Sequence, residues 1–345
     1  MTRILASEAV CRAGPPEPAW LAVDDGLILE VGTGAPPPGA ETVVGIVAAG
    51  LVDLQVNGFG DVHFADADRD ALRGASEALA RAGTTSFCPT LVSRDLAEYD
   101  DRLSLLAGIG VGAHLEGPFL GRAPGAHSVR HLRELGTSEL AILLALVERH
   151  PVAMVTLAPE ADPGFVGVRA LAERGVLVAL GHSTARLDDA VAAADAGARA
   201  VTHLFNAMGA FHHRDPGLVG AALDDPRLVP TLIADLVHVH PAALRVAIAA
   251  KPRSALVSDA VARGSDRRPD GSLAGSRITL ADAVRNLVSI GVPIEQAVSM
   301  ASAVPSDLLG LGDRGRIEAG RRADLVVLQP STIRVMRVIR AGVDL

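Results

Sequence analysis

The sequence has few aromatic residues, few cysteines and almost no lysine. Aromatic side chains are 3% of its 345 residues, which leaves few rings on which nucleic-acid bases could stack. Because the net charge is -8, the chain is not expected to bind nucleic acid. Its two cysteines, Cys11 and Cys88, give neither a disulfide framework nor the spacing of a zinc finger.

Long hydrophobic runs are also missing. The longest apolar stretch covers residues 140–147 and is far too short to cross a bilayer. The N-terminal residues lack the charged start and the apolar run of a signal peptide. We therefore expect a cytoplasmic protein with no membrane partner.

A sizeable hydrophobic core is nevertheless expected, because 49% of the residues are hydrophobic and 21% are charged. Strand-like segments at residues 27–32, 323–328 and 335–338 lie near the two ends of the chain. They predict a small β-sandwich domain that is built from residues 1–47 and 312–345.

The middle of the chain, residues 48–311, alternates apolar strands with amphipathic helices such as 185–197 and 241–250. About eight such units in roughly 260 residues is the size of a (β/α)8 TIM-like barrel, so we expect an α/β fold of this kind. A doubly wound open sheet is the alternative, but no GxGxxG follows the first strand of this region. The expected barrel strands end at Val56, Leu91, Leu115, Leu157, Leu180, His203, Ala234 and Ser258.

Almost every expected barrel strand ends in a side chain that can bind a metal ion or transfer a proton. In such a barrel the carboxyl ends of all strands converge on the face where catalysis takes place. One such residue carries little weight, whereas a series over successive strands is hard to explain by packing. The series is Gln55, Asn57, His114, Glu116, Glu160, His182, His203, Asp235, His238 and Asp259.

The expected metal ligands are Glu116, His182 and His203, since each follows an apolar strand. Two imidazoles and one carboxylate suit Zn²⁺ or a similar divalent ion and leave a position open for water. Such an ion lowers the pKa of that water and polarises a carbonyl group. In the alternative interpretation each histidine only caps a strand through backbone hydrogen bonds, which suits a lone histidine better than this trio.

Proton transfer is assigned to Asp259, which ends the last expected strand. Its carboxylate can take a proton from the activated water and pass it to a leaving amine, although a helix N-cap is the alternative role. His127 lies in a loop after the Glu116 strand and can donate a hydrogen bond to a substrate oxyanion.

Several residues near these strand ends can hold an anionic substrate. Asn206 and Ala207 follow His203 and can begin a helix, whose free N–H groups attract anions. Arg214 can bind a phosphate through two hydrogen bonds, although a solvated surface arginine is the commoner case. His238 is expected to contact substrate and His240 to lie at the surface, with an HxH metal pair as the alternative.

A second metal ion is not expected. The first barrel strand carries Gln55-Val56-Asn57, where binuclear hydrolases of this fold often have HxH. The only lysine, Lys251, precedes Pro252 at an expected helix end, so it is not expected to bridge two metals as a carboxylated side chain. One ion per subunit, with Zn²⁺ as the expected metal, is the simpler inference.

The sequence resembles the N-acetylglucosamine-6-phosphate deacetylase family of the amidohydrolase superfamily. HLEGPF (114–119) together with THLFNAM (202–208) is quite specific for this family. The remaining motifs, in order over nearly the whole chain, are GLVDLQVNGFG (50–60), GAH (125–127), TLAPE (156–160), GHSTA (181–185), RDPGLVGAA (214–222), IADLVHV (233–239), SDA (258–260), LAGS (273–276) and the closing segments ASAVPSDLLGL and GRIEAGRRADLVVL.

The resemblance implies hydrolysis of the acetamide of N-acetylglucosamine 6-phosphate to glucosamine 6-phosphate and acetate. It implies one metal ion held by Glu116, His182 and His203, with Asp259 as the catalytic acid and base. It also implies homodimers in which the neighbouring subunit completes the phosphate site. The residues implied to contact the sugar phosphate are Ala126, His127, Asn206, Ala207, Arg214, His238, Leu273, Ala274 and Gly275.

Two departures from the family concern the substrate more than the chemistry. The segment from Val261 to Ser272 is shorter than in the family, where it is often a hairpin. Leu236-Val237 stand where the family tends to have glycine after the aspartate. The hypotheses left open are another acetylated amino sugar, a cyclic amide or a nucleobase as substrate, and a non-catalytic relative that keeps only the pocket.

Overall fold

The computed structural model describes residues 2–345 and contains an eight-stranded parallel sheet with the topology of a barrel. Each strand pairs with the next one along the chain, in the order β15-β14-β13-β12-β11-β10-β9-β6. This order confirms the expected (β/α)8 architecture. The strands are β6 (Leu51–Val56), β9 (Thr84–Val92), β10 (Ala113–Glu116), β11 (Val152–Leu157), β12 (Leu177–Leu180), β13 (Ala200–Val201), β14 (Val229–Ile233) and β15 (Ala255–Val257).

The first and last strands of this sheet are joined by main-chain hydrogen bonds. Val56 at the end of β6 forms a parallel bridge with Ala260, which follows β15. The N–H of Asn57 donates to the carbonyl oxygen of Ala260 at 2.7 Å, and the N–H of Asp259 donates to that of Gln55 at 2.9 Å. This seam brings side chains of the first and last strands together at the rim of the barrel.

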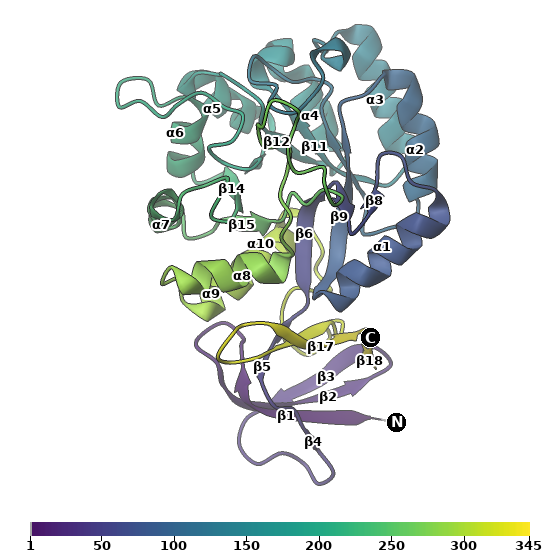
Figure 1. Ribbon diagram of the computed structural model, residues 1–345, viewed down its shortest axis with the longest axis vertical. Helices are drawn as coiled ribbons and strands as arrows, with labels where there is room; N and C mark the ends of the chain where they lie inside the picture. The colour runs from purple at the N-terminus through teal and green to yellow at the C-terminus, as the bar shows by residue number, and fades with distance from the viewer. Residues whose placement is uncertain (1) are drawn as a thin grey trace. The chain divides into compact units, whose positions relative to one another are not determined.

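Continuous apolar runs form the strands because both faces of the sheet are covered. Every residue of β14 is buried, for example. Figure 1 shows helices α2 to α7 around the outside of the strands. The two helices predicted from the sequence are present as α5 and α7. The helices along this part of the chain are α1 (Arg69–Arg81), α2 (Tyr99–Leu106), α3 (Thr137–Arg149), α4 (Val166–Glu173), α5 (Leu187–Ala196), α6 (Gly217–Asp224) and α7 (Pro241–Ala250). Short 3-10 turns lie at Leu96–Glu98, Val129–His131, Pro159–Ala161 and Pro163–Phe165.

A second, mixed sheet combines strands from both termini, as the sequence predicted. Its order is β18-β17-β16-β5-β1-β2-β3, with β4 paired to β1, and one cluster of buried apolar side chains packs within it. Its strands are β1 (Arg3–Val10), β2 (Glu17–Asp24), β3 (Leu27–Gly32), β4 (Glu41–Thr42), β5 (Ile46–Ala49), β16 (Leu325–Leu328), β17 (Val335–Arg340) and β18 (Val343–Asp344).

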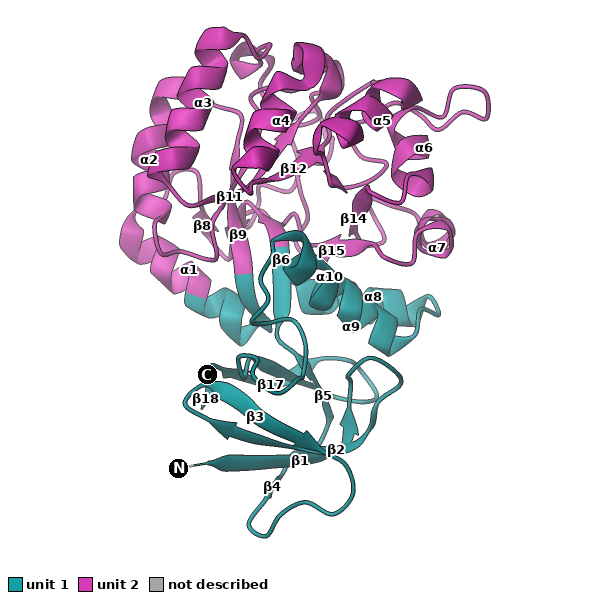
Figure 2. Ribbon diagram, turned by 180° about the vertical axis from the view of Figure 1, so that it is seen from behind, with its two compact units in different colours: residues 1–53, 77–86, 278–345 teal, residues 54–76, 87–277 magenta. Residues whose placement is uncertain are grey.

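The chain forms two compact units, which Figure 2 colours separately. The first comprises residues 1–53, 77–86 and 278–345, and it includes α8 (Leu280–Ser289), α9 (Ile294–Ala301) and α10 (Ala303–Leu308). The second comprises residues 54–76 and 87–277, including a small hairpin of β7 (Gly58–Phe59) and β8 (Val62–His63). The domain boundaries after residue 47 and before residue 312 remain a prediction. Within residues 2–345, the helices are all too short or too polar to cross a membrane.

The backbone is strained at several strand ends. His182, His203 and Asp259 have φ angles of 51°, 32° and 47°, in the left-handed region that side-chain-bearing residues rarely adopt. Such strain is typical of functional sites. Leu236 has a φ of 64°, so this leucine takes a conformation that glycine adopts without cost.

A buried aspartate holds the start of α4 and gives a test of the fold. The side chain of Asp162 accepts hydrogen bonds from the N–H groups of Gly167 at 3.0 Å and Val168 at 2.8 Å. Asp162→Ala leaves these buried donors without partners, and we expect it to lower the free energy of unfolding by about 2–3 kcal/mol. Urea denaturation measures this loss. Asp188→Ala, at an exposed aspartate in the first turn of α5, is the control and should change stability by less than about 0.5 kcal/mol.

Candidate active site and metal centre

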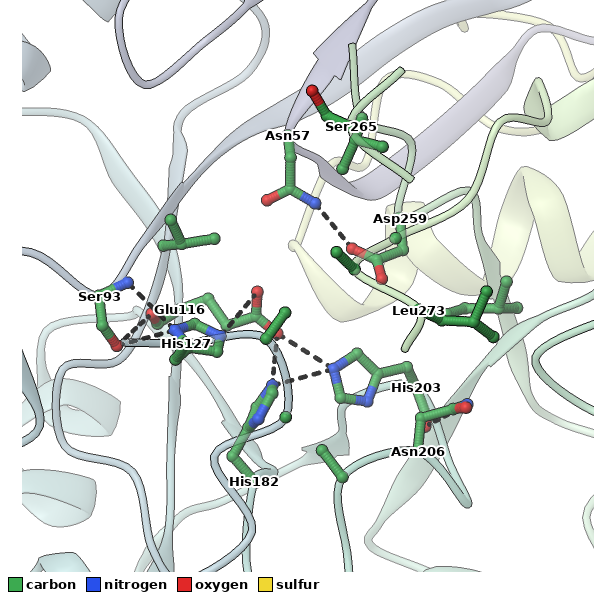
Figure 3. A pocket seen from close by; sticks show the side chains of 18 of the residues that line it. Asn57, Ser93, Glu116, His127, His182, His203, Asn206, Asp259, Ser265 and Leu273 are labelled. Atoms are coloured by element: carbon green, nitrogen blue, oxygen red, sulfur yellow. Dashed lines mark hydrogen bonds and ion pairs between the residues drawn. The ribbon is translucent and has the colours of Figure 1, made fainter. Parts of the chain in front are cut away.

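A cavity of about 460 Å³ opens at the carboxyl ends of the barrel strands, and Figure 3 shows its interior. Its lining includes almost all the residues to which the sequence assigned a role. Those that line it are Glu116, Ala126, His127, His182, His203, Asn206, Ala207, His238, Asp259, Leu273, Ala274 and Gly275.

Three of these side chains converge on one point. Glu116 Oε1 lies 3.0 Å from His182 Nε2 and 3.1 Å from His203 Nε2. The two ring nitrogens are 3.1 Å apart. All three residues are buried. For comparison, ligand atoms about 2 Å from a tetrahedral ion are separated by about 3.3 Å, so this triangle is close to the size that a bound metal requires.

The hydrogen bonds of His182 fix the chemistry of its inner nitrogen. Its Nδ1 faces the carbonyl oxygens of Ala123 at 3.3 Å and Pro124 at 3.1 Å, and carbonyl oxygens only accept. Nδ1 therefore carries the proton, and Nε2 of the neutral ring is an acceptor that faces the acceptor Glu116 Oε1. Two acceptors at 3.0 Å are stable only with positive charge between them, either a proton or a metal ion.

His127 belongs to the same buried cluster, but its ring carries the proton on the other nitrogen, Nε2. Its Nε2 lies 3.6 Å from Glu116 Oε2, and candidate ligand atoms of Glu116, His127 and His182 all lie within 4.8 Å of one another. However, its Nδ1 accepts the backbone N–H of Ser93 at 3.2 Å and is 2.9 Å from the Ser93 hydroxyl. In the neutral ring the proton is then on Nε2, which makes His127 a hydrogen-bond donor toward the cavity.

Asp259 accepts hydrogen bonds from two amide side chains, one of which links it to this cluster. Its Oδ1 accepts from Asn57 Nδ2 at 2.7 Å and from Gln55 Nε2 at 3.1 Å. The same Gln55 nitrogen donates to Glu116 Oε1 at 2.9 Å. Sequence reasoning noticed both amides at a strand end but gave them no function, because their proximity to Asp259 depends on the closure of the barrel.

The cluster carries a negative charge at Glu116. Burial raises the pKa of this carboxyl, but the contacts with the His127, His182 and His203 rings and the charge of His182 outweigh burial, so the pKa lies well below the ordinary value. His114, also in the strand-end series, is different. It is fully buried, bonds the hydroxyls of Thr90 and Thr156, and burial lowers its pKa to about 4. It is therefore a neutral core histidine rather than part of the cavity lining.

Two further residues of the strand-end series also have clear partners. His238 lines the cavity, and its Nδ1 lies 2.6 Å from Asp235 Oδ2. Burial raises the pKa of Asp235, but hydrogen bonds from the His238 ring and from nearby backbone N–H groups outweigh it and lower the pKa. His240 is instead the N-cap of α7, where it accepts the N–H of Ala242, so it lies at a helix start as expected.

Arg214 is the one predicted substrate contact that is not in the cavity lining of its own chain. It is exposed, and its Nη1 lies 2.9 Å from His213 Nε2. It belongs to the loop that precedes α6 and projects from the barrel in Figure 1. Phe211 in the same loop is 57% exposed.

The segment after Asp259 forms a small hairpin. Arg267 and Leu273 form an antiparallel bridge, and the N–H of Arg268 donates to the carbonyl oxygen of Ser272 at 2.9 Å. Arg268 also donates to the carbonyl oxygen of Gly125 at 3.0 Å. The end of this hairpin, from Leu273 onward, supplies one wall of the cavity.

Sequence reasoning missed five polar residues of the lining, namely His63, Ser93, Ser128, His131 and Ser265. Ser93 directly follows β9, so its position at a strand end was the signal that could have found it. His63 lies in β8 and His131 in a 3-10 turn, and neither has a pattern in the sequence that points to the cavity.

Comparison with known proteins identifies the family of the chain. The amidohydrolase family model matches residues 46–342. The N-acetylglucosamine-6-phosphate deacetylase of Bos taurus is 39% identical over 83% of this chain and 80% of its own length. The N-acetylgalactosamine-6-phosphate deacetylase of Escherichia coli O157:H7 is 35% identical over 95% of both chains.

Solved structures give the same grouping. The N-acetyl-D-glucosamine-6-phosphate deacetylase of Mycobacterium smegmatis has a TM-score of 0.93 and 33% identity, over 99% of this chain and 100% of its own. A mutant of that enzyme in complex with N-acetyl-D-glucosamine-6-phosphate has a TM-score of 0.93 and 32% identity, over 99% of both chains. A D-hydantoinase, at 16% identity and a TM-score of 0.70, shares the fold over 100% of this chain and 95% of its own. The chain belongs to the amidohydrolase family, within the group that contains the N-acetylglucosamine-6-phosphate deacetylases.

Proposed function

We propose that this protein is a metal-dependent deacetylase that hydrolyses N-acetylglucosamine 6-phosphate to glucosamine 6-phosphate and acetate. The names of its relatives support this activity. The observation that carries the proposal is the presence of Glu116, His182, His203 and Asp259 in one cavity at the catalytic end of the barrel. The Escherichia coli relative, named for the galactosamine epimer, supports another acetylated amino sugar as the second candidate substrate. A cytoplasmic location agrees with a sugar phosphate substrate and remains a prediction.

Glu116, His182 and His203 are proposed to hold one divalent cation, and Zn²⁺ suits two imidazoles and a carboxylate. Two observations support this set over one that includes His127. The distances among Glu116 Oε1, His182 Nε2 and His203 Nε2 are close to those that a bound ion requires, and the lone pair of His182 Nε2 points toward the other two atoms. When bound, the cation supplies a Lewis acid for the acetyl carbonyl and lowers the pKa of the attacking water.

Asp259 and His127 are proposed to carry out the proton chemistry. Asp259 takes one proton from the attacking water as the new C–O bond forms. It then delivers this proton to the amide nitrogen as the C–N bond breaks, so acetate and a free amine leave. His127 Nε2 donates a hydrogen bond to the carbonyl oxygen, where negative charge develops.

The sugar phosphate is proposed to contact the remaining lining residues, with Arg214 as a phosphate ligand. Since Arg214 is exposed and outside the cavity of its own chain, we propose that it acts in a homodimer on the site of the neighbouring subunit. Its projecting loop and exposed Phe211 support this arrangement.

The proposed ligand set predicts how single variants bind Zn²⁺. His182→Ala and His203→Ala each remove a ligand, so we expect affinity to fall by at least about 100-fold, whereas His127→Ala stays within about tenfold of wild type. Competition with a chromophoric chelator measures these affinities. His150→Ala, at a histidine that bonds Asp100 away from the cavity, is the control. A loss for His127→Ala as large as that for His203→Ala would show that His127 is a ligand instead.

Asp259→Asn tests the proposed chemistry, because it keeps the shape of the side chain and removes the base. We expect kcat for acetate release to fall by about 10²- to 10⁴-fold with a small change in KM. Chelator treatment should abolish wild-type activity, and added Zn²⁺ should restore it. The proposal is wrong if the metal-loaded wild type releases no acetate, or if Asp259→Asn is as active as wild type.

Arg214→Ala tests the role of the phosphate. Loss of a charged hydrogen-bond donor should raise KM for the 6-phosphate by about 10- to 100-fold and leave hydrolysis of unphosphorylated N-acetylglucosamine unchanged. Arg245→Ala, at an exposed arginine on α7, is the control. If Arg214 acts across a dimer, mixing Arg214→Ala subunits with Asp259→Asn subunits restores activity. No restoration in a proven mixed dimer would place its action within one chain.

A further inference from the structure

Asn57 has a fixed place beside the proposed acid and base. It follows β6, is 4% exposed and lines the cavity. Its backbone N–H donates to Ala260 at 2.7 Å, and its carbonyl oxygen accepts from Phe64 at 2.9 Å. The main chain is therefore anchored on both sides, which leaves its side chain little freedom of position.

The orientation of the Asn57 amide follows from its partner. Its group nearest to Asp259 lies 2.7 Å from Oδ1, and a carboxylate oxygen accepts hydrogen bonds, so this group is the NH₂. The amide oxygen then lies on the opposite side. Figure 3 shows the nitrogen of Asn57 directed at Asp259 and the oxygen pointing away from it.

The amide oxygen of Asn57 is an acceptor without a partner. It is buried and has no hydrogen bond to any group in residues 2–345. Leaving a buried acceptor unpaired costs about 1–3 kcal/mol, so such a group at the wall of a cavity is a place where a ligand with a donor gains affinity. The substrate of the proposed reaction has a donor of this kind, the N–H of its acetamido group.

We propose that Asn57 is a substrate-binding residue that accepts the acetamido N–H through Oδ1 while its NH₂ holds Asp259. This inference rests on the proposed function. It places the nitrogen whose C–N bond breaks next to the carboxyl group that protonates it. As that bond breaks the nitrogen becomes an amine, which keeps a proton for the same contact.

The proposal predicts that Asn57 matters more for an amide than for an ester. A 2-O-acetylglucose 6-phosphate has an oxygen where the natural substrate has N–H, so it cannot donate to Asn57. Misplacement of Asp259 also affects the amide more than the ester, because an amine leaves only after protonation. Asp259→Asn on both substrates gives the size of that difference, and an excess difference in the Asn57 variants reports the contact with the substrate.

The experiment compares Asn57→Ala and Asn57→Leu with wild type on both substrates, with Zn²⁺ bound. Asn57→Leu keeps the side-chain volume, so it gives an answer even if the smaller alanine disturbs packing. We expect the difference between the losses of kcat/KM on the amide and on the ester to exceed that in Asp259→Asn by at least about tenfold. Asp61→Ala, at an exposed residue of the β7–β8 hairpin, is the control and should affect neither substrate.

The outcomes distinguish this inference from the function on which it rests. A difference between the amide and the ester no larger than that in Asp259→Asn would overturn the substrate contact and leave Asn57 as a positioning residue for Asp259. Unchanged activity on both substrates would overturn both of its proposed roles. A wild-type protein that releases acetate from neither substrate would instead overturn the proposed function itself.

Discussion

A buried negative charge at Glu116 is the constraint around which the site is arranged. Placing a carboxylate in the interior of a protein costs several kcal/mol unless other groups compensate the charge. Here three imidazoles and the NH₂ of Gln55 surround it, and one of those imidazoles presents an acceptor rather than a donor. A positive charge in their midst resolves this conflict, so the arrangement of the side chains itself favours a cation.

The loops around the cluster give chemically identical side chains different roles. Main-chain carbonyl groups before Gly125 hold His182 with its lone pair inward, whereas the N–H of Ser93 holds His127 with its proton inward. One histidine is thereby suited to bind a metal and the other to stabilise an oxyanion. The difference arises from the backbone partner of each ring, which is why residue type alone does not distinguish ligand from donor.

Much of the fold and of the cavity lining could be predicted from the sequence. Parallel strands are buried on both faces, so they appear as apolar runs, and a polar residue such as His182 or Asp259 marks the end of each run. The environment of each side chain was harder to predict. His114 and Glu116 lie two residues apart on β10, yet one is a neutral core residue and the other is the centre of the cluster. Nor does the sequence show that Arg214 lies outside the cavity, because the direction of a loop depends on packing.

The residues proposed for proton transfer lie where the first and last strands of the barrel meet, whereas the residues proposed to bind the metal lie elsewhere in the barrel. Gln55 lies in β6, Asn57 directly follows it, and Asp259 follows β15. Glu116 ends β10, and His182 and His203 follow β12 and β13, which lie in the interior of the sheet order. Local opening between β6 and β15 would separate the aspartate from its two amides without moving the three metal-binding candidates apart. The proposed proton transfer therefore depends on contacts across the closure of the barrel, whereas the proposed cation site depends on side chains at the ends of strands inside the sheet.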